Sequence, residues 1–174
     1  MRRGQIWVET VIYTLIGLSL IGIVIALVMP KIEEFKDKST IEQTIEVLNL
    51  IDSKVNEVLA APGNVRYIKL KMRRGELLIN GTSDEIIYEL SGIDTKYSET
   101  GISIEIGSVN ILTNVSGANY KVTLSLNFSN YNLTYDGADV AEKFSGVSIP
   151  YEFIILNNGT SSPGEKIQID IRVS

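Results

Sequence analysis

An uncharged apolar run of about 20 residues lies near the start of the chain, at residues 10–29. A helix rises 1.5 Å per residue, so this run would be about 30 Å long, which matches the hydrocarbon core of a bilayer. Arg2 and Arg3 precede the run, and basic residues before a span favour a cytoplasmic N-terminus. We therefore expect one membrane-spanning helix, with everything after Pro30 outside the cytoplasm.

The residues in front of the run suggest where the chain is processed. No small-residue cleavage site follows the run, as it would in a secretory signal peptide. Arg3-Gly4 precede Gln5, and Glu9 would be the fifth residue of a chain cut after Gly4. This segment resembles the class III signal peptide of archaeal type IV prepilins, whose mature start follows a Gln-x-Ser-x-Glu pattern; Trp7 stands at the serine position. The resemblance implies cleavage between Gly4 and Gln5 by a prepilin peptidase.

Glu9 is the carboxylate that accompanies the apolar run. A charge at membrane depth is costly and marks a functional site by default. In one interpretation Glu9 lies at the cytoplasmic interface and reaches water. In the other, it pairs with the new α-amino group at Gln5 of a neighbouring subunit and sets the axial register during assembly.

The sequence after Pro30 predicts an amphipathic helix followed by a β-rich domain. Apolar residues recur every three or four positions up to Leu59, and Pro62-Gly63 ends the pattern. Four parts are predicted: a leader at 1–4, an apolar helix at 5–29, an amphipathic continuation at 30–61 and an extracytoplasmic head at 62–174. The fold class is α+β, with the long helix packed on a C-terminal antiparallel β-domain.

Alternating apolar residues predict the strands of the head. Arg74-Gly75, between the strand patterns at 65–72 and 76–80, predicts a hairpin. A long turn over 157–164 separates the last two strands. We expect residues 136–148 to form a loop with a short helix near 140–144.

Five Asn-x-Ser/Thr sequons lie in the predicted head, more than the composition would produce by chance. Their presence on one side of the span favours an exported surface that is open to glycosylation, although a β-domain rich in Asn, Ser and Thr is the alternative. The possible glycosylation sites are Asn80, Asn114, Asn127, Asn132 and Asn158.

Composition excludes several functions. The chain has no Cys and no His, which rules out disulfides, thiolate or imidazole metal ligands and Ser-His or Cys-His catalysis. The formal charge is −5, and no basic surface predicts nucleic-acid binding. We expect no catalytic residues, no metal site and no cofactor. The acidic stretch from Asp136 to Asp139 lacks the spacing of a calcium loop and is expected to be a turn.

Aromatic residues are frequent in one part of the head. They fit either an exposed adhesive surface or ordinary strand packing, and packing is the expectation. These residues are Tyr120, Phe128, Tyr131 and Tyr135.

The resemblance implies a structural subunit rather than an enzyme. The precursor would sit in the membrane, be cut, and be assembled by a pilus motor and platform into a homo-oligomeric helical filament on the cell surface. Two alternatives stay open: a minor pilin or pseudopilin of a secretion or assembly machine, and a single-pass anchored surface protein that binds or adheres through its head.

Overall fold

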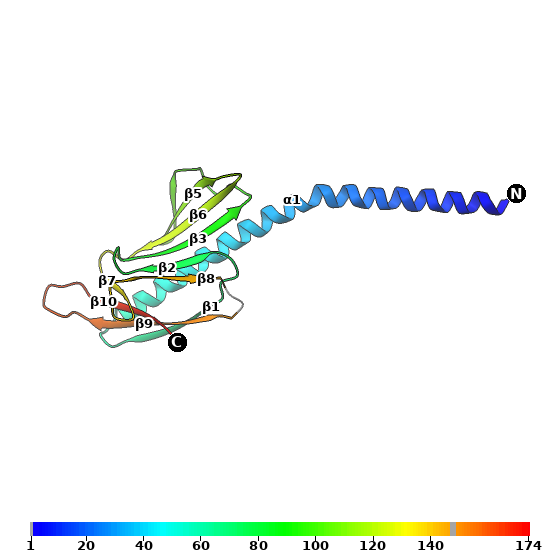
Figure 1. Cartoon of the computed structure of the whole chain (residues 1–174). Coiled ribbons are helices and arrows are strands. Elements are labelled where there is room, and N and C mark those ends of the chain that lie inside the picture. The colour runs from blue at the N-terminus through cyan, green and yellow to red at the C-terminus, as the bar shows by residue number, and fades with distance from the viewer. Residues whose placement is uncertain (1, 147–148) are drawn as a thin grey trace. The chain divides into compact units, whose positions relative to one another are not determined.

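The computed structural model describes residues 2–146 and 149–174, and side chains from Trp7 onward within those ranges. The chain divides into two compact units, Met1–Asp37 and Lys38–Ser174. One helix, α1 (Arg2–Val58), runs through both, and the second unit also contains all the strands (Figure 1). The predicted α+β class, with a long N-terminal helix packed on a β-domain, is confirmed.

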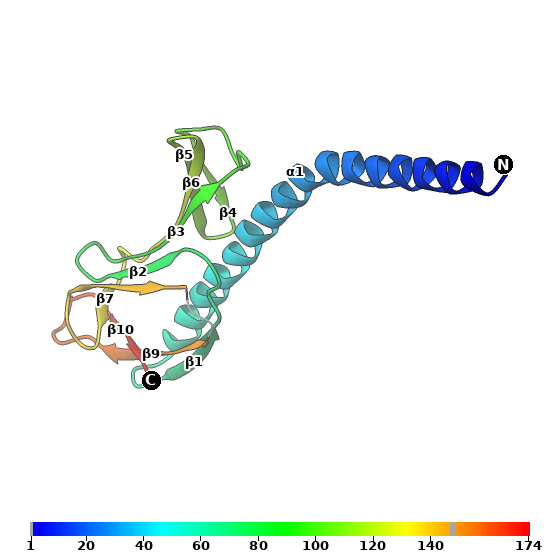
Figure 2. The same ribbon diagram turned by 45° about the vertical axis from the view of Figure 1, so that its right-hand side comes forward.

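The strands form two sheets (Figures 1 and 2). The four-stranded sheet has the order β1-β9-β10-β7, and the six-stranded sheet has the order β4-β5-β6-β3-β2-β8. All pairs are antiparallel except β10 with β7. The strands within the described residues are β1 (Val65–Leu70), β2 (Glu76–Asn80), β3 (Glu85–Ile93), β4 (Ser103–Ile106), β5 (Val109–Ser116), β6 (Asn119–Asn127), β7 (Asn132–Tyr135), β8 (Ala141–Ser145), β9 (Tyr151–Gly159) and β10 (Gln168–Val173).

The second half of α1 belongs to the core of the head. Its apolar residues recur at spacings of three and four, which places them on one face of the helix. Ile41, Ile45, Leu48, Ile51, Val55 and Val58 are buried.

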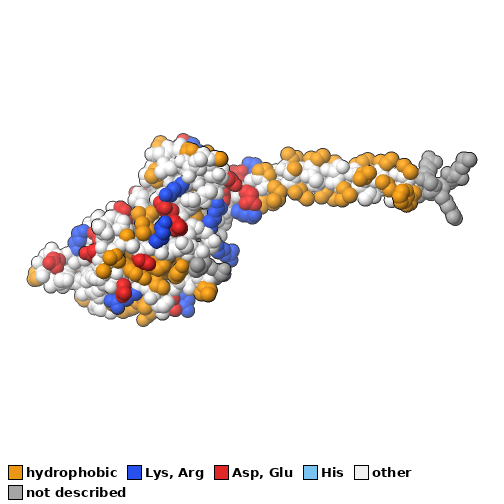
Figure 3. Space-filling model, in the orientation of Figure 1, with side chains coloured by type: hydrophobic (Ala, Val, Ile, Leu, Met, Phe, Trp, Pro, Cys, Tyr) orange, Lys and Arg blue, Asp and Glu red, His pale blue; other side chains and the backbone are white. Residues whose placement is uncertain are grey.

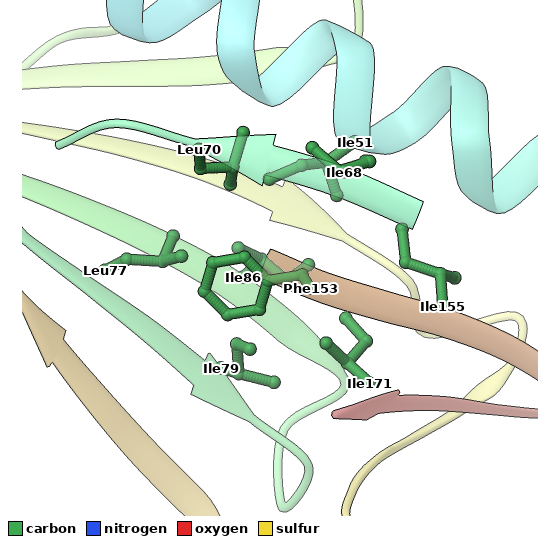
Figure 4. A pocket seen from close by; sticks show the side chains of 9 residues that line it. All are labelled: Ile51, Ile68, Leu70, Leu77, Ile79, Ile86, Phe153, Ile155 and Ile171. Atoms are coloured by element: carbon green, nitrogen blue, oxygen red, sulfur yellow. The ribbon is translucent and has the colours of Figure 1, made fainter. Parts of the chain in front are cut away.

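One apolar core joins this helix to both sheets. Figure 4 shows the side chains of Ile51 from α1, Phe153 from β9 and Ile79 from β2 converging on the same small cavity. Ile68 and Leu70 from β1, Ile86 from β3 and Ile171 from β10 also line it. Because neither sheet has a separate core, the helix and both sheets stabilise one another.

A polar contact also ties the helix to the edge strand β1. Glu57 accepts hydrogen bonds from Lys54 at 2.5 Å and from Arg66 of β1 at 2.6 Å. These two bonds, that of Lys54 first, lower the pKa of the Glu57 carboxyl below its ordinary value.

The expected hairpin across Arg74-Gly75 is wrong. β1 pairs with β9, whereas β2 pairs with β3 and β8, so residues 71–75 carry the chain from one sheet to the other. A two-residue hairpin of the commonest kind needs positive φ at both central residues. Gly75 has φ 88°, but Arg74 is not in that region. A Cβ at Gly75 would also lie 2.6 Å from the carbonyl oxygen of Glu89, so the crossing requires glycine.

The expected short helix near residues 140–144 is also wrong. These residues overlap β8, which pairs antiparallel with β2 at the edge of the six-stranded sheet. Phe144 is the buried side chain of β8 and packs edge-on against Tyr135, Tyr151 and Phe153. A strand with one buried residue has too little alternation to be recognised from its sequence.

The end of α1 is held by a buried amide. The Nδ2 of Asn157, in β9, donates to the carbonyl oxygens of Val58 at 2.9 Å and Ala61 at 3.3 Å. Its Oδ1 accepts from the backbone N of Gly159 at 2.8 Å. The last carbonyls of a helix lack intrahelical partners, so Asn157 supplies one from the sheet.

Replacing Leu48 with Ala should destabilise the head by about 2–5 kcal/mol, because the side chain is fully buried and its removal leaves a cavity. The matched control is Leu50→Ala, since Leu50 is 44% exposed on the same helix and should change stability by less than about 0.5 kcal/mol. Urea denaturation of the full chain in detergent micelles, followed by near-ultraviolet circular dichroism of the tyrosines, measures both. Equal losses would contradict the packing described for the helix.

Replacing Asn157 with Ala should cost about 1–3 kcal/mol, because it leaves buried backbone groups unpaired. Asn158→Ala is the control, since Asn158 is the exposed neighbour. The same denaturation assay, with protein from a host that does not glycosylate, compares the two. If Asn157→Ala were as stable as Asn158→Ala, the helix end would not depend on this amide.

Candidate functional site

The apolar part of α1 has no partner for its side chains within the described residues. Its large apolar residues from Trp7 to Met29 are 40–74% exposed. Figure 3 shows them along the visible face of this segment as orange surface. By length and composition the helix can cross a membrane, and a signal sequence near the N-terminus meets the same criteria. Such a surface is stable only against lipid or other apolar helices.

The polar side chains of this segment bond to their own helix. The Oγ1 of Thr14 donates to the carbonyl oxygen of Thr10, and the Oγ of Ser19 donates to that of Leu15, both at 2.8 Å. Such bonds can satisfy hydroxyl groups in a bilayer, where no water is present. A Cβ at Gly17 or Gly22 would meet nothing within 4 Å, so both glycines leave open surface where a neighbouring helix can approach.

Glu9 is exposed at the beginning of this surface. Among the described side chains, no base forms an ion pair with its carboxylate. The side chains of the predicted cleavage residues Arg3 and Gln5 lie outside the described side chains, and the backbone of Arg3, Gly4 and Gln5 is helical. The structure therefore places Glu9 where a group from another molecule can reach it.

The apolar segment is followed by paired charges. Lys31 pairs with Glu34 at 2.7 Å, and Lys36 pairs with Glu33 at 2.8 Å. Both are exposed pairs of residues three apart on the helix, and such pairs contribute little to stability.

The five sequons differ in accessibility. Asn114, Asn127 and Asn158 are exposed, whereas Asn80 and Asn132 are half-buried. The hydroxyl-bearing residue of the Asn132 sequon, Thr134, is 1% exposed, and its Oγ1 donates to Asp170 at 2.8 Å. A glycosyl transferase must reach both the Asn and the hydroxyl residue, so the folded head presents three sequons better than the other two.

Residues 136–139, which begin and end with an aspartate, form a tight turn. Asp136 and Gly137 have φ angles of 50° and 78°, and the backbones of Tyr135 and Ala138 exchange bonds of 2.9 and 3.1 Å. Positive φ at both central positions defines a type I′ turn. No cluster of three or more potential metal ligands occurs among the described residues.

The aromatic residues considered for adhesion pack against the core. Phe128 is buried in the core, and Tyr120, Tyr131 and Tyr135 are half-buried against that core.

Sequence reasoning missed Asn157 and also Asp170, a fully buried carboxylate on β10. Apolar residues mark both strands in the sequence, but no local pattern shows that one amide or carboxylate faces inward.

Comparison of the chain with protein-family models, curated proteins and solved structures finds no match to it. The architecture alone therefore carries the assignment: a long apolar N-terminal helix packs on a mostly antiparallel β-domain. That architecture is pilin-like.

We expect glycan addition to separate the sequons by their exposure. An oligosaccharyltransferase given the folded chain should modify peptides containing Asn114, Asn127 or Asn158 and leave Asn132 unmodified. The same enzyme given a urea-unfolded chain, diluted immediately before the reaction, should also modify Asn132. Peptide mass spectrometry measures the occupancy, and equal modification of Asn132 in both samples would contradict the burial of Thr134.

Proposed function

We propose that this chain is the structural subunit of a type IV pilus-like surface filament. The observation that supports it most directly is the apolar half of α1, exposed on all its large side chains and joined to a folded head. In the membrane, lipid covers this surface. In a filament, identical helices cover it, and dispersion contacts between them take the place of contacts with lipid.

The resemblance of residues 3–9 to an archaeal class III signal peptide supplies the processing step. A prepilin peptidase would cut between Gly4 and Gln5, and the hydrophobic helix would stay with the mature chain. The precursor is thus a single-pass membrane protein with a cytoplasmic N-terminus, and the mature subunit is extracellular. A pilus motor and platform would extract it. This role is structural rather than enzymatic.

Glu9 gives the assembly its register in this proposal. Cleavage creates an α-amino group at Gln5, and a subunit shifted along the filament can bring that amine to the Glu9 carboxylate of its neighbour. Glu9 is exposed in the isolated chain, as this pairing requires. Surrounded by apolar helices, the two charges would attract each other far more strongly than in water.

The processing step is tested by mass spectrometry of the mature N-terminus, together with negative-stain microscopy of material sheared from expressing cells. We expect a chain that begins at Gln5 and is found in filaments. Replacing Gly4 with Val should block cleavage and leave the precursor in the membrane. Retention of Met1 or Arg2 without filaments would favour the anchored surface protein instead.

Glu9→Gln should reduce surface filaments by at least about tenfold, because breaking a buried ion pair costs about 3–5 kcal/mol and 1.4 kcal/mol corresponds to a factor of ten. The matched control is Glu33→Gln, the same change on the same helix at an exposed pair, and it should assemble normally. Both variants should enter the membrane and be cleaved. Normal filaments from Glu9→Gln would show that assembly does not depend on the Glu9 carboxylate.

A further inference from the structure

Two oppositely charged features lie at the two ends of the β2–β8 ladder. Asn80 pairs with Ala141 at one end, and Glu76 pairs with Ser145 at the other. The acidic turn at 136–140 leads into the first end, and the basic segment 69–74 leads into the second. A strand of five residues is about 14–17 Å long, so the two features are well separated on one head.

The acidic feature, which we name the acidic knob, consists of residues 136–142. All seven residues are exposed, and the segment contains three acids and no base. Asp139 and Glu142 make no ion pair with any described residue, while Asp136 has only Arg172, at 3.9 Å. Burial raises the pKa of the nearby Tyr135 hydroxyl, and the charges of Glu142 and Asp136 raise it further.

The knob is held in a fixed conformation. The buried carboxylate of Asp170 accepts hydrogen bonds from the backbone N of Gly137 at 2.7 Å and from Arg172 at 2.6 Å. On its other side, the carbonyl oxygen of Val140 accepts from the backbone N of Gly81 at 2.9 Å. A surface feature already ordered in the free molecule loses little conformational entropy on binding.

The basic feature, which we name the basic groove, is a hollow of about 430 Å³. Its lining includes Arg73, Arg74, Ser91, Ser145 and Gly146. Two acids also line it, and each has its own lysine: Glu76 pairs with Lys143 at 2.6 Å, and Glu89 pairs with Lys121 at 2.7 Å. Both glutamates of the lining are therefore already paired with lysines.

One arginine of the groove is available to a partner, and Lys71 lies two residues before it in the chain. Lys71 and Arg73 are exposed, and within the described residues neither forms a hydrogen bond or an ion pair. Arg74 donates to the carbonyl oxygens of Ser91, at 3.2 Å, and Gly92. The groove thus combines Arg74, which is hydrogen-bonded to the backbone, with the exposed Arg73.

We propose that the acidic knob of one head docks in the basic groove of a second copy of this chain. The argument is charge complementarity: an acidic turn held by hydrogen bonds and a hollow lined by the exposed Arg73, which makes no ion pair with a described residue, are both present on the same molecule. Because knob and groove are different surfaces at opposite ends of one ladder, the contact is heterologous, and in an open filament it joins each head to the next. The inference deepens the proposed filament function, on which it rests, by naming a contact between heads.

The absence of cysteine from the chain permits a direct test by disulfide formation. The full chain carrying both Arg73→Cys and Asp139→Cys is expressed in cells and oxidised, and non-reducing gels are run. The two cysteines of one head lie too far apart to bridge, since a disulfide needs Cα atoms within about 7 Å. A ladder of dimers, trimers and longer species is therefore expected, and reduction should abolish it.

Matched variants make the result specific to knob and groove. Each single-cysteine variant should remain monomeric, and a mixture of the two should stop at dimers. Replacing Lys69 with Cys instead of Arg73, together with Asp139→Cys, should give no ladder, because Lys69 belongs to the same basic segment but does not line the groove. A ladder from this control as strong as that from Arg73→Cys would overturn the proposal.

Charge exchange supplies a readout without cysteine. Arg73→Asp and Asp139→Arg should each reduce sheared filaments several-fold, and the double variant should restore them. If neither single variant changes assembly, or the double variant does not recover, the contact is wrong. If Arg73→Asp loses binding to anionic lipid vesicles and the cysteine pair gives no ladder, the groove binds a lipid surface and the proposal is overturned.

Failure of the head contact is distinguishable from failure of the filament. Filaments that give no series of disulfide-linked species on the gel would contradict the knob-and-groove contact and leave the proposed function standing. A ladder without filaments supports the contact and contradicts the proposed filament. Neither ladder nor filaments contradicts both.

Discussion

Exposed apolar surface on the first half of α1 is the constraint on which the rest of this protein depends. A helix with large apolar side chains on all sides cannot remain alone in water, because its burial is the dominant favourable term available to it. In the function proposed here, lipid covers it first and other copies of the chain cover it later. The core of the head includes residues of this helix from Ile41 onward.

The head folds without disulfides, because the chain has no Cys. It does so by sharing one core among the second half of α1 and both sheets. Buried polar groups connect the parts where apolar contact ends. Asn157 joins β9 to the helix end, and Asp170 joins β10 to the turn after β7. Within the described residues, no buried side-chain nitrogen or oxygen lacks a hydrogen-bond partner, which is what a stable and unique core requires.

Sequence reasoning succeeded where a pattern is long and local. The apolar helix, its amphipathic continuation and most of the strands follow from periodicity over many residues. It failed where the outcome depends on distant partners. The pattern around Arg74-Gly75 is that of a hairpin, yet β2 is flanked by β3 and β8, and β8 lies more than 60 residues later. The strand β8 itself was missed because Phe144 is its one buried side chain, and its place is set by pairing with β2.

The sequence by itself determined that this chain has a membrane-length apolar helix with one acid at its start, because length, hydropathy and charge are local properties. It also determined the presence of the acidic segment 136–142 and the basic segment 69–74. Tertiary structure alone decided that these two segments lie at opposite ends of one ladder, that Thr134 is buried beneath its sequon, and that Asn157 meets the helix end. Each of these depends on strand register between residues far apart in the chain, and register is set by the packing of the whole core rather than by any local pattern.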